Sequence, residues 1–118
     1  VNPVTRARIP IVLDSELVDP EVGTGVVKIT PAHDANDHAA GQRHGLAALE
    51  VLDAAGTVRW PDGPGSHFDG LPRFDARTAL LKELQATGHL RGVDDHPMVI
   101  PICSRTGDVI EPMLSPQW

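Results

Sequence analysis

The sequence predicts an α+β fold of short elements, and three observations lead to this class. Eleven glycines and eleven prolines among 118 residues favour many turns over long helices. Runs of β-branched residues are interspersed unevenly with helix-like stretches, unlike the regular alternation of a doubly wound sheet. The residues are 41% hydrophobic but only 3% aromatic, so the core is expected to be aliphatic. The length predicts a single domain, residues 1–118.

The expected strands come from short β-branched runs that end at glycine or proline. "RIPIVLD" (8–14) and "GVVKIT" (25–30) have this composition, and a glycine-closed loop separates them. Pro31 ends the second run because proline cannot donate to a ladder. Two hairpins are expected further on. They pair "LEVLD" with "TVRW" (49–60), and the two sides of the turn "SRTGD" (104–108).

Two helices are predicted from their capping signals. Asp34 is a good N-cap for Ala35–His44, a segment without β-branched residues that Gly45 stops. A second helix is expected with Asp75 as its cap and Gly88 as its end. Its apolar stripe consists of Ala79, Leu80, Leu81 and Leu84. The Gly- and Pro-rich stretch between Trp60 and Phe74 is expected to be a surface loop.

Several classes of protein are excluded by composition. No stretch approaches the roughly 20 apolar residues of a membrane span, and no secretory leader precedes Ile9. The single Cys103 can form no internal disulfide, and we expect it to be a small apolar residue in a reducing cytoplasm. A net charge of −6 argues against holding nucleic acid by electrostatics alone. We therefore expect neither a membrane nor DNA as a partner.

Acidic and imidazole side chains crowd into "GVVKITPAHDANDHAAGQRHGL" (25–46). The structural interpretation is that Asp34 caps the helix while Asp37, at the third helical position, returns to the cap and meets the positive end of the helix dipole. The functional interpretation is that one of the two carboxylates faces a ligand such as an ammonium group. Both can hold, because one carboxylate can cap while the other binds.

A metal site is the weaker alternative. His33 with Asp37, and Asp34 with His38, are four residues apart and could share a helical face. The two pairs point in different directions, however, and no matching ligand pair follows downstream. No serine lies in a GxSxG setting either. From the residues alone, the chain is an α+β domain with a polar junction between a strand and a helix.

The motifs "GTGVVKITPAHDANDHAAGQRHGL", "RIPIVLD" and "SRTGDVIEPMLSPQW" together closely resemble valyl-tRNA synthetases, specifically the later part of their inserted editing domain. Isoleucyl-tRNA synthetases have a related domain but typically a histidine where this chain has Lys28, and leucyl-type enzymes are less similar. The resemblance implies a β-barrel-like mixed sheet of short strands with flanking helices, incomplete at the N-terminus. It also implies hydrolysis of threonine mischarged onto tRNA(Val).

Carried over residue by residue, the resemblance implies that Asp37 binds the α-ammonium of the threonyl group. Lys28 and Thr30, two apart on one strand, would line the pocket. Thr30 or Asp34 would meet the substrate hydroxyl, and His33 would orient its neighbours. Asp37 and Asp34 are the expected catalytic residues. A positioned water and the ribose hydroxyls of the tRNA would carry out hydrolysis, with neither metal nor cofactor.

The same resemblance sets limits on what the chain is expected to do alone. The HIGH and KMSKS elements that bind ATP are absent from these residues, so ATP-dependent ligation would belong to the parent synthetase only. A threonine-rich strand that forms the other wall of the pocket is also missing, so the chain is expected to be a fragment that works with the remainder of the synthetase. The tRNA acceptor end is the expected partner, and the candidates to meet it, by charge only, are Arg43, Arg59 and Arg105.

Three alternatives follow for the function. The first is a non-catalytic module that binds the tRNA acceptor end, and the second is the editing domain of an isoleucyl-type enzyme. The third is a stand-alone metal hydrolase that would use the side chains of His33, Asp34, Asp37 and His38.

Overall fold

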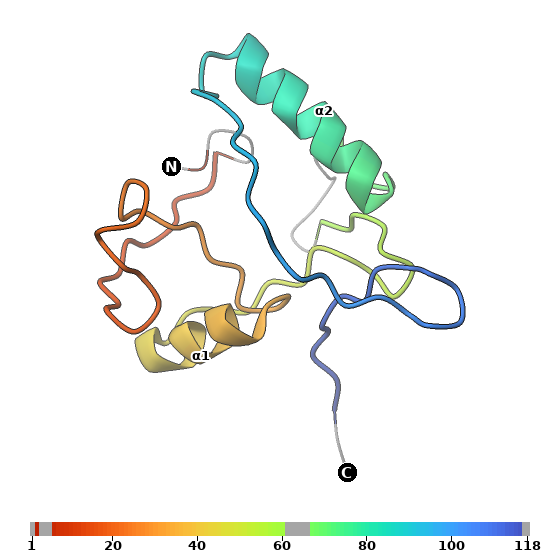
Figure 1. Ribbon diagram of the computed structural model, residues 1–118, viewed down its shortest axis with the longest axis horizontal. Coiled ribbons are helices and arrows are strands. Elements are labelled where there is room, and N and C mark those ends of the chain that lie inside the picture. Colours follow the sequence, from red (N-terminus) through yellow and green to blue (C-terminus); the bar gives the residue numbers. More distant parts are fainter. Residues whose placement is uncertain (1, 3–5, 61–66, 117–118) are drawn as a thin grey trace. The chain divides into compact units, whose positions relative to one another are not determined.

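The computed structural model describes residue 2, residues 6–60 and residues 67–116. Within these ranges the chain forms two helices, α1 (Ala35–His44) and α2 (Arg73–Ala86), shown in Figure 1. It divides into two compact units. The α1 unit comprises Pro10–Glu50 and Glu111–Trp118, and the α2 unit comprises Val1–Ile9 and Val51–Ile110. The expectation of a single domain stays a prediction. No helix in the described ranges has both the length and the apolarity to cross a bilayer.

The predicted bounds of α1 are confirmed. Asp34 is the N-cap, with extended backbone, and its Oδ1 accepts hydrogen bonds from the amides of Asn36 (2.8 Å) and Asp37 (3.1 Å). Gly45 is the C-cap in the left-handed conformation, with φ of 62°, which glycine adopts without steric cost. Because both signals lie within the helix or next to it, the sequence alone was sufficient to locate it.

The start of α2 was predicted three residues too late, with Asp75 as the N-cap. Pro72 is the N-cap and makes no side-chain cap bond, so Asp75 lies within the first turn instead of capping the helix. A proline at this boundary needs no amide partner, and the acidic side chain still meets the positive helix end. The helix ends at Thr87, the C-cap, whose hydroxyl donates to the carbonyl of Glu83 (2.8 Å). Gly88 follows with φ of 73°.

The predicted β-barrel-like sheet is wrong. The described residues contain no strand, and Figure 1 accordingly draws no strand arrow in them. Antiparallel pairing is confined to three isolated bridges, Leu52 with Val58, Thr57 with Pro72, and Ile102 with Val109. The two expected hairpins are therefore present as turns with a single bridge each, and the runs 8–14 and 25–30 are irregular.

The reason for this difference is the lack of pairing partners. A strand exists only when a neighbouring strand takes up its backbone donors and acceptors, and β-branched composition alone does not supply one. Ile11 and Leu13 in the first run are 95% and 92% exposed, and Val26 in the second is 82% exposed. Neither run thus packs an apolar face against another described element.

The core is small and consists mainly of alanine. The buried apolar residues are Ala32 and Ala40 in the α1 unit, and Phe68 and Ala76 in the α2 unit. The large aliphatic side chains expected in the core are largely exposed or half-buried in the described ranges. Close backbone packing therefore matters locally. In the α1 unit, a Cβ added at Gly41 would lie only 2.8 Å from Cβ of Pro31.

We predict that Gly41→Ala destabilises α1. Replacing glycine by alanine inside a helix normally stabilises it by about 0.5–1 kcal/mol. Here the new methyl group would overlap the rigid ring of Pro31, so we expect a net loss of about 1–3 kcal/mol. Faster hydrogen exchange of the α1 amides would measure this loss. Gly92→Ala is the matched control, because nothing lies within 4 Å of its added Cβ. Unchanged or slower exchange in Gly41→Ala would contradict the packing argument.

Candidate functional site

Asp37 and Thr30 form the central contact of the candidate site. Asp37 lies in the first turn of α1, and its Oδ2 accepts hydrogen bonds from the backbone amide of Thr30 (2.6 Å) and from the Thr30 hydroxyl (3.3 Å). Asp37 thus bonds to the segment before the helix instead of returning to the cap. Its other oxygen, Oδ1, accepts no hydrogen bond from the described residues and can receive a donor from a ligand.

Lys28 joins this pair through the Thr30 hydroxyl, to which its ammonium group donates a long hydrogen bond of 3.4 Å. Although most of the Lys28 residue is exposed, the surrounding protein partly desolvates its ammonium group and lowers the pKa of Lys28. The negative charge of Asp37 acts in the opposite direction. Three of the predicted site residues, Lys28, Thr30 and Asp37, are therefore brought together.

The other predicted site residues have different partners. Oδ1 of Asp34 is taken up by the helix cap, whereas its Oδ2 has no hydrogen-bond partner among the described residues. Nδ1 of His33 lies 3.4 Å from the carbonyl of Pro112, and Nδ1 of His38 lies 3.1 Å from the carbonyl of Pro31. His33 thus lies beside the C-terminal segment of the α1 unit, and His38 lies beside the segment that precedes α1.

A cavity of about 240 Å³ lies beside the N-terminal end of α1. Its walls are mostly apolar, and Asp34 and His38 contribute the polar side chains. The predicted pocket residues Lys28, Thr30 and Asp37 do not line it. A larger cavity of about 440 Å³ belongs to the α2 unit and contains none of the predicted site residues.

The metal alternative finds no support in the geometry. Across residues 2, 6–60 and 67–116, no three His, Cys, Asp or Glu side chains are grouped so that they could hold an ion. His33 and His38 face backbone carbonyls, and Asp34 caps its helix.

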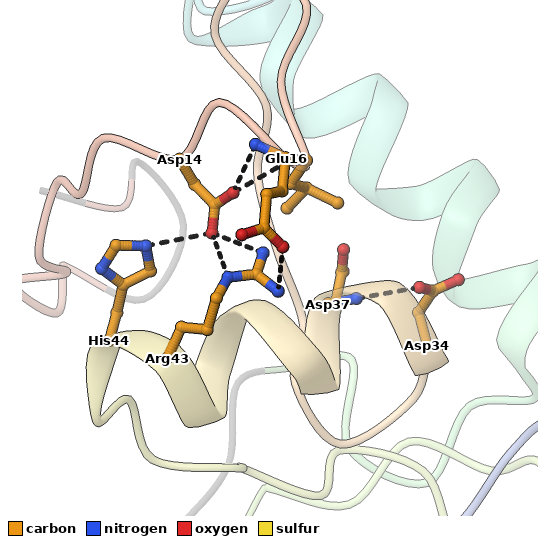
Figure 2. Close-up of polar contacts among 7 residues, drawn as sticks. Asp14, Glu16, Asp34, Asp37, Arg43 and His44 are labelled. Carbon is orange, nitrogen blue, oxygen red and sulfur yellow. Dashed lines mark hydrogen bonds and ion pairs between the residues drawn. The ribbon is translucent and has the colours of Figure 1, made fainter.

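Sequence reasoning missed an ion-pair cluster at the other end of α1, drawn in Figure 2. Oδ2 of Asp14 accepts hydrogen bonds from Nη2 of Arg43 (2.6 Å), Nε of Arg43 (3.1 Å) and Nε2 of His44 (3.0 Å). Arg43 also pairs with Glu16 at 3.2 Å. The sequence does show two basic residues in the last turn of α1, a position where cations interact favourably with the helix dipole. Their acidic partner lies 29 residues earlier, and nothing in the local pattern identifies it.

Two of the three arginines considered as RNA contacts therefore already have acidic partners. Arg43 is paired with Asp14 and Glu16, and Nε of Arg59 lies 3.2 Å from Asp53. Arg105 is exposed. Contact of any of them with tRNA stays a prediction.

No family model matches the chain. Individual proteins do match it. The chain is 51% identical over 118 residues to a valine–tRNA ligase of Homo sapiens, covering all of the chain and 9% of that protein. It is 48% identical over 118 residues to a probable mitochondrial valine–tRNA ligase of Dictyostelium discoideum, covering all of the chain and 11% of the relative. It is 46% identical over 117 residues to a mitochondrial valine–tRNA ligase of Saccharomyces cerevisiae, covering 99% of the chain and 10% of the relative.

The three relatives named above are aminoacyl-tRNA ligases. Within that class, the chain is homologous over its full length to a segment of valine–tRNA ligase, as its resemblance to valyl-tRNA synthetases predicted. It spans only about a tenth of the length of these relatives.

We predict that the Asp14 cluster loses its stabilising effect in acid. The hydrogen bond from Arg43, helped by the amide of Leu17 and by His44, lowers the pKa of Asp14 from 3.8 to about 2, although burial opposes the shift. A carboxyl group whose pKa is lower in the folded state stabilises the fold above its unfolded pKa. That contribution is therefore complete above about pH 4 and is lost as the pH falls toward 2.

Carbon-13 NMR titration of the Asp14 carboxyl group measures the pKa directly. In unfolding experiments, the stability difference between the unmodified chain and Asp14→Asn should shrink over the same pH range. Asp94→Asn, at an exposed position, is the control and should leave that pH dependence unchanged. A carboxyl group that titrates near 3.8 would contradict the prediction.

Proposed function

We propose that this chain forms part of the editing site of a valine–tRNA ligase, which hydrolyses threonine mischarged onto tRNA(Val). The observation that carries the proposal is the contact of Asp37 with Thr30. It holds the acidic side chain of Asp37 away from the helix cap, and the second carboxylate oxygen accepts no hydrogen bond from the described residues. The chain's homology to a segment of valine–tRNA ligase supports the assignment. The synthetic reaction, with its ATP, would belong to other parts of such a ligase.

Editing is needed because a pocket shaped for valine cannot strongly reject threonine, which replaces a methyl group by a hydroxyl; valyl-tRNA synthetase is itself the standard illustration of this limit. A second site must therefore select threonine by its hydroxyl. A polar pocket does so because bound valine would leave the polar groups of that pocket without partners. The Thr30 hydroxyl keeps one lone pair beyond its bonds to Asp37 and Lys28, and the Lys28 ammonium group keeps two donors beyond its bond to Thr30, so both supply polar groups of this kind.

In the proposed mechanism, Asp37 binds the substrate's α-ammonium group through Oδ1, a charge-assisted contact. Its Oδ2 stays bound to Thr30, which fixes the direction of the carboxylate. A water molecule, oriented with the help of the tRNA ribose hydroxyls, attacks the ester carbonyl carbon. The bond between this carbon and the ribose oxygen breaks, and the ribose oxygen takes up a proton. Threonine and free tRNA are released, and no metal takes part.

The proposed partners are the acceptor end of tRNA(Val) and the remainder of the ligase. Homology to a tRNA ligase supports both. A compartment is harder to assign because two of the relatives described above are named as mitochondrial. The cytoplasmic location expected from the sequence therefore stays a prediction.

We predict that Asp37→Ala lowers deacylation of threonyl-tRNA(Val) by about 10- to 100-fold, the kinetic equivalent of losing a contact to a charged group worth about 1.5–3 kcal/mol. The assay uses preformed threonyl-tRNA without ATP. It tests the 118-residue chain and a human valine–tRNA ligase in which these residues replace the matching segment. Asp75→Ala is the matched control, because Asp75 occupies the same first-turn position in α2.

The outcomes of this deacylation assay show whether the chain contains a complete editing site and whether Asp37 takes part in it. Hydrolysis by the chain alone would mean that these residues contain a complete site, and hydrolysis only by the chimera would mean that other parts of the ligase complete it. If Asp37→Ala leaves hydrolysis unchanged in both proteins, the proposed function is wrong. Retained tRNA binding with no hydrolysis in either unmodified protein would favour a non-catalytic module that binds the acceptor end.

We predict a second effect, on selectivity, for Thr30→Val. This variant keeps the backbone amide that binds Asp37 but removes the hydroxyl. If that hydroxyl meets the substrate hydroxyl, the ratio of threonyl to valyl ester hydrolysis should fall by about 2- to 10-fold, the equivalent of one neutral hydrogen bond. Asp34→Asn, which retains an oxygen for the helix cap, tests the other candidate partner. A ratio that falls only in Asp34→Asn would transfer the role to Asp34.

A further inference from the structure

The carboxylate of Asp14 accepts hydrogen bonds through both of its oxygens. Its side chain is only 5% exposed. Oδ1 accepts hydrogen bonds from the amides of Glu16 (3.0 Å) and Leu17 (2.9 Å), and Oδ2 accepts those from Arg43 and His44 described above. Figure 2 shows the carboxylate between the turn that follows it and the last turn of α1. One side chain thus ties a loop to the C-terminal end of a helix.

Asp37 lies toward the opposite end of that same helix. The helix has ten residues and is therefore about 15 Å long. Near its start, the Thr30–Asp37 bonds and the packing of Pro31 on Gly41 join the helix to the segment before it. These contacts all involve the short segment 30–31, so on their own they leave the helix able to pivot about it. The Asp14 cluster holds the other end and restricts this motion.

We propose that Asp14 is a positioning residue for editing, because it anchors the C-terminal end of α1 and thereby fixes where the Asp37 carboxylate meets the substrate ammonium group. This inference rests on the proposed function. Without the anchor, α1 can tilt and the ammonium contact lengthens. Small misplacements of this kind are costly, since an error of about 1 Å can slow a reaction by roughly 100-fold.

The first test is Asp14→Asn in the human ligase chimera described above. The amide keeps the approximate shape and can still accept from the amides of Glu16 and Leu17, but it loses the charge that holds Arg43. We expect threonyl-tRNA(Val) deacylation to fall by about tenfold. Asp53→Asn is the matched control. Asp53 also accepts from two backbone amides and an arginine, Arg59, but in the α2 unit.

A double-mutant cycle separates positioning from a general loss of stability. If Asp14 acts through Asp37, Asp14→Asn should have little further effect on deacylation once Asp37→Ala is present. A purely structural role would instead lower activity by the same factor in both backgrounds. Additive effects, or an unchanged rate in Asp14→Asn alone, would overturn the inference.

A second readout uses a substrate without the ammonium group. With N-acetyl-threonyl-tRNA(Val), the contact with Asp37 is absent, so Asp14→Asn should slow hydrolysis less than it does with the free amine. An equal slowing of both substrates would overturn the positioning role.

Failure of this inference can be distinguished from failure of the proposed function. The proposed function fails when Asp37→Ala itself has no effect, whereas the positioning role alone fails when Asp37→Ala is impaired and Asp14→Asn is not.

Discussion

The N-cap of α1 is the interaction on which the candidate site depends. Oδ1 of Asp34 satisfies the amides of Asn36 and Asp37, so the helix start needs no second acidic side chain. Asp37 can therefore turn toward Thr30, where one of its oxygens accepts two hydrogen bonds and the other accepts none from the described residues. Two carboxylates three residues apart thus have separate tasks. The cap holds the helix, and Asp37 provides an acceptor for a ligand.

The described ranges contain no strand, so backbone amides in the turns bond to side chains instead of to a neighbouring strand. Asp14, Asp19 and Asp53 each accept hydrogen bonds from backbone amides two to four residues later, and these bonds close the turns. Each turn is local and does not need a neighbouring segment to form. These local bonds explain how the chain can follow an ordered path although the buried apolar residues among those described are only three alanines and one phenylalanine.

The elements that could be predicted from sequence are those determined by local contacts. The helix α1 was predicted with its cap and its stop because Asp34 and Gly45 act on the residues beside them. The sheet was predicted wrongly because strands depend on partners distant in sequence, which composition does not reveal. The site shows the same division. The contact between Thr30 and Asp37 crosses seven positions, and the sequence analysis grouped the two residues only through the family resemblance, without predicting that they bond to each other. The contact between Asp14 and Arg43 crosses 29 positions, and no local pattern indicates it.

The distribution of charge also bears on how RNA would reach the proposed site. The chain has a net charge of −6, which opposes the approach of a phosphate backbone. Arg43 and Arg59 are bonded to Asp14 and Asp53, so contacting a phosphate would mean sharing or giving up an ion pair. For Arg43 this would also loosen the far end of α1. Under the proposed function, the affinity for tRNA must therefore come mainly from other parts of the ligase, while this segment contributes selectivity for the ester that the tRNA carries.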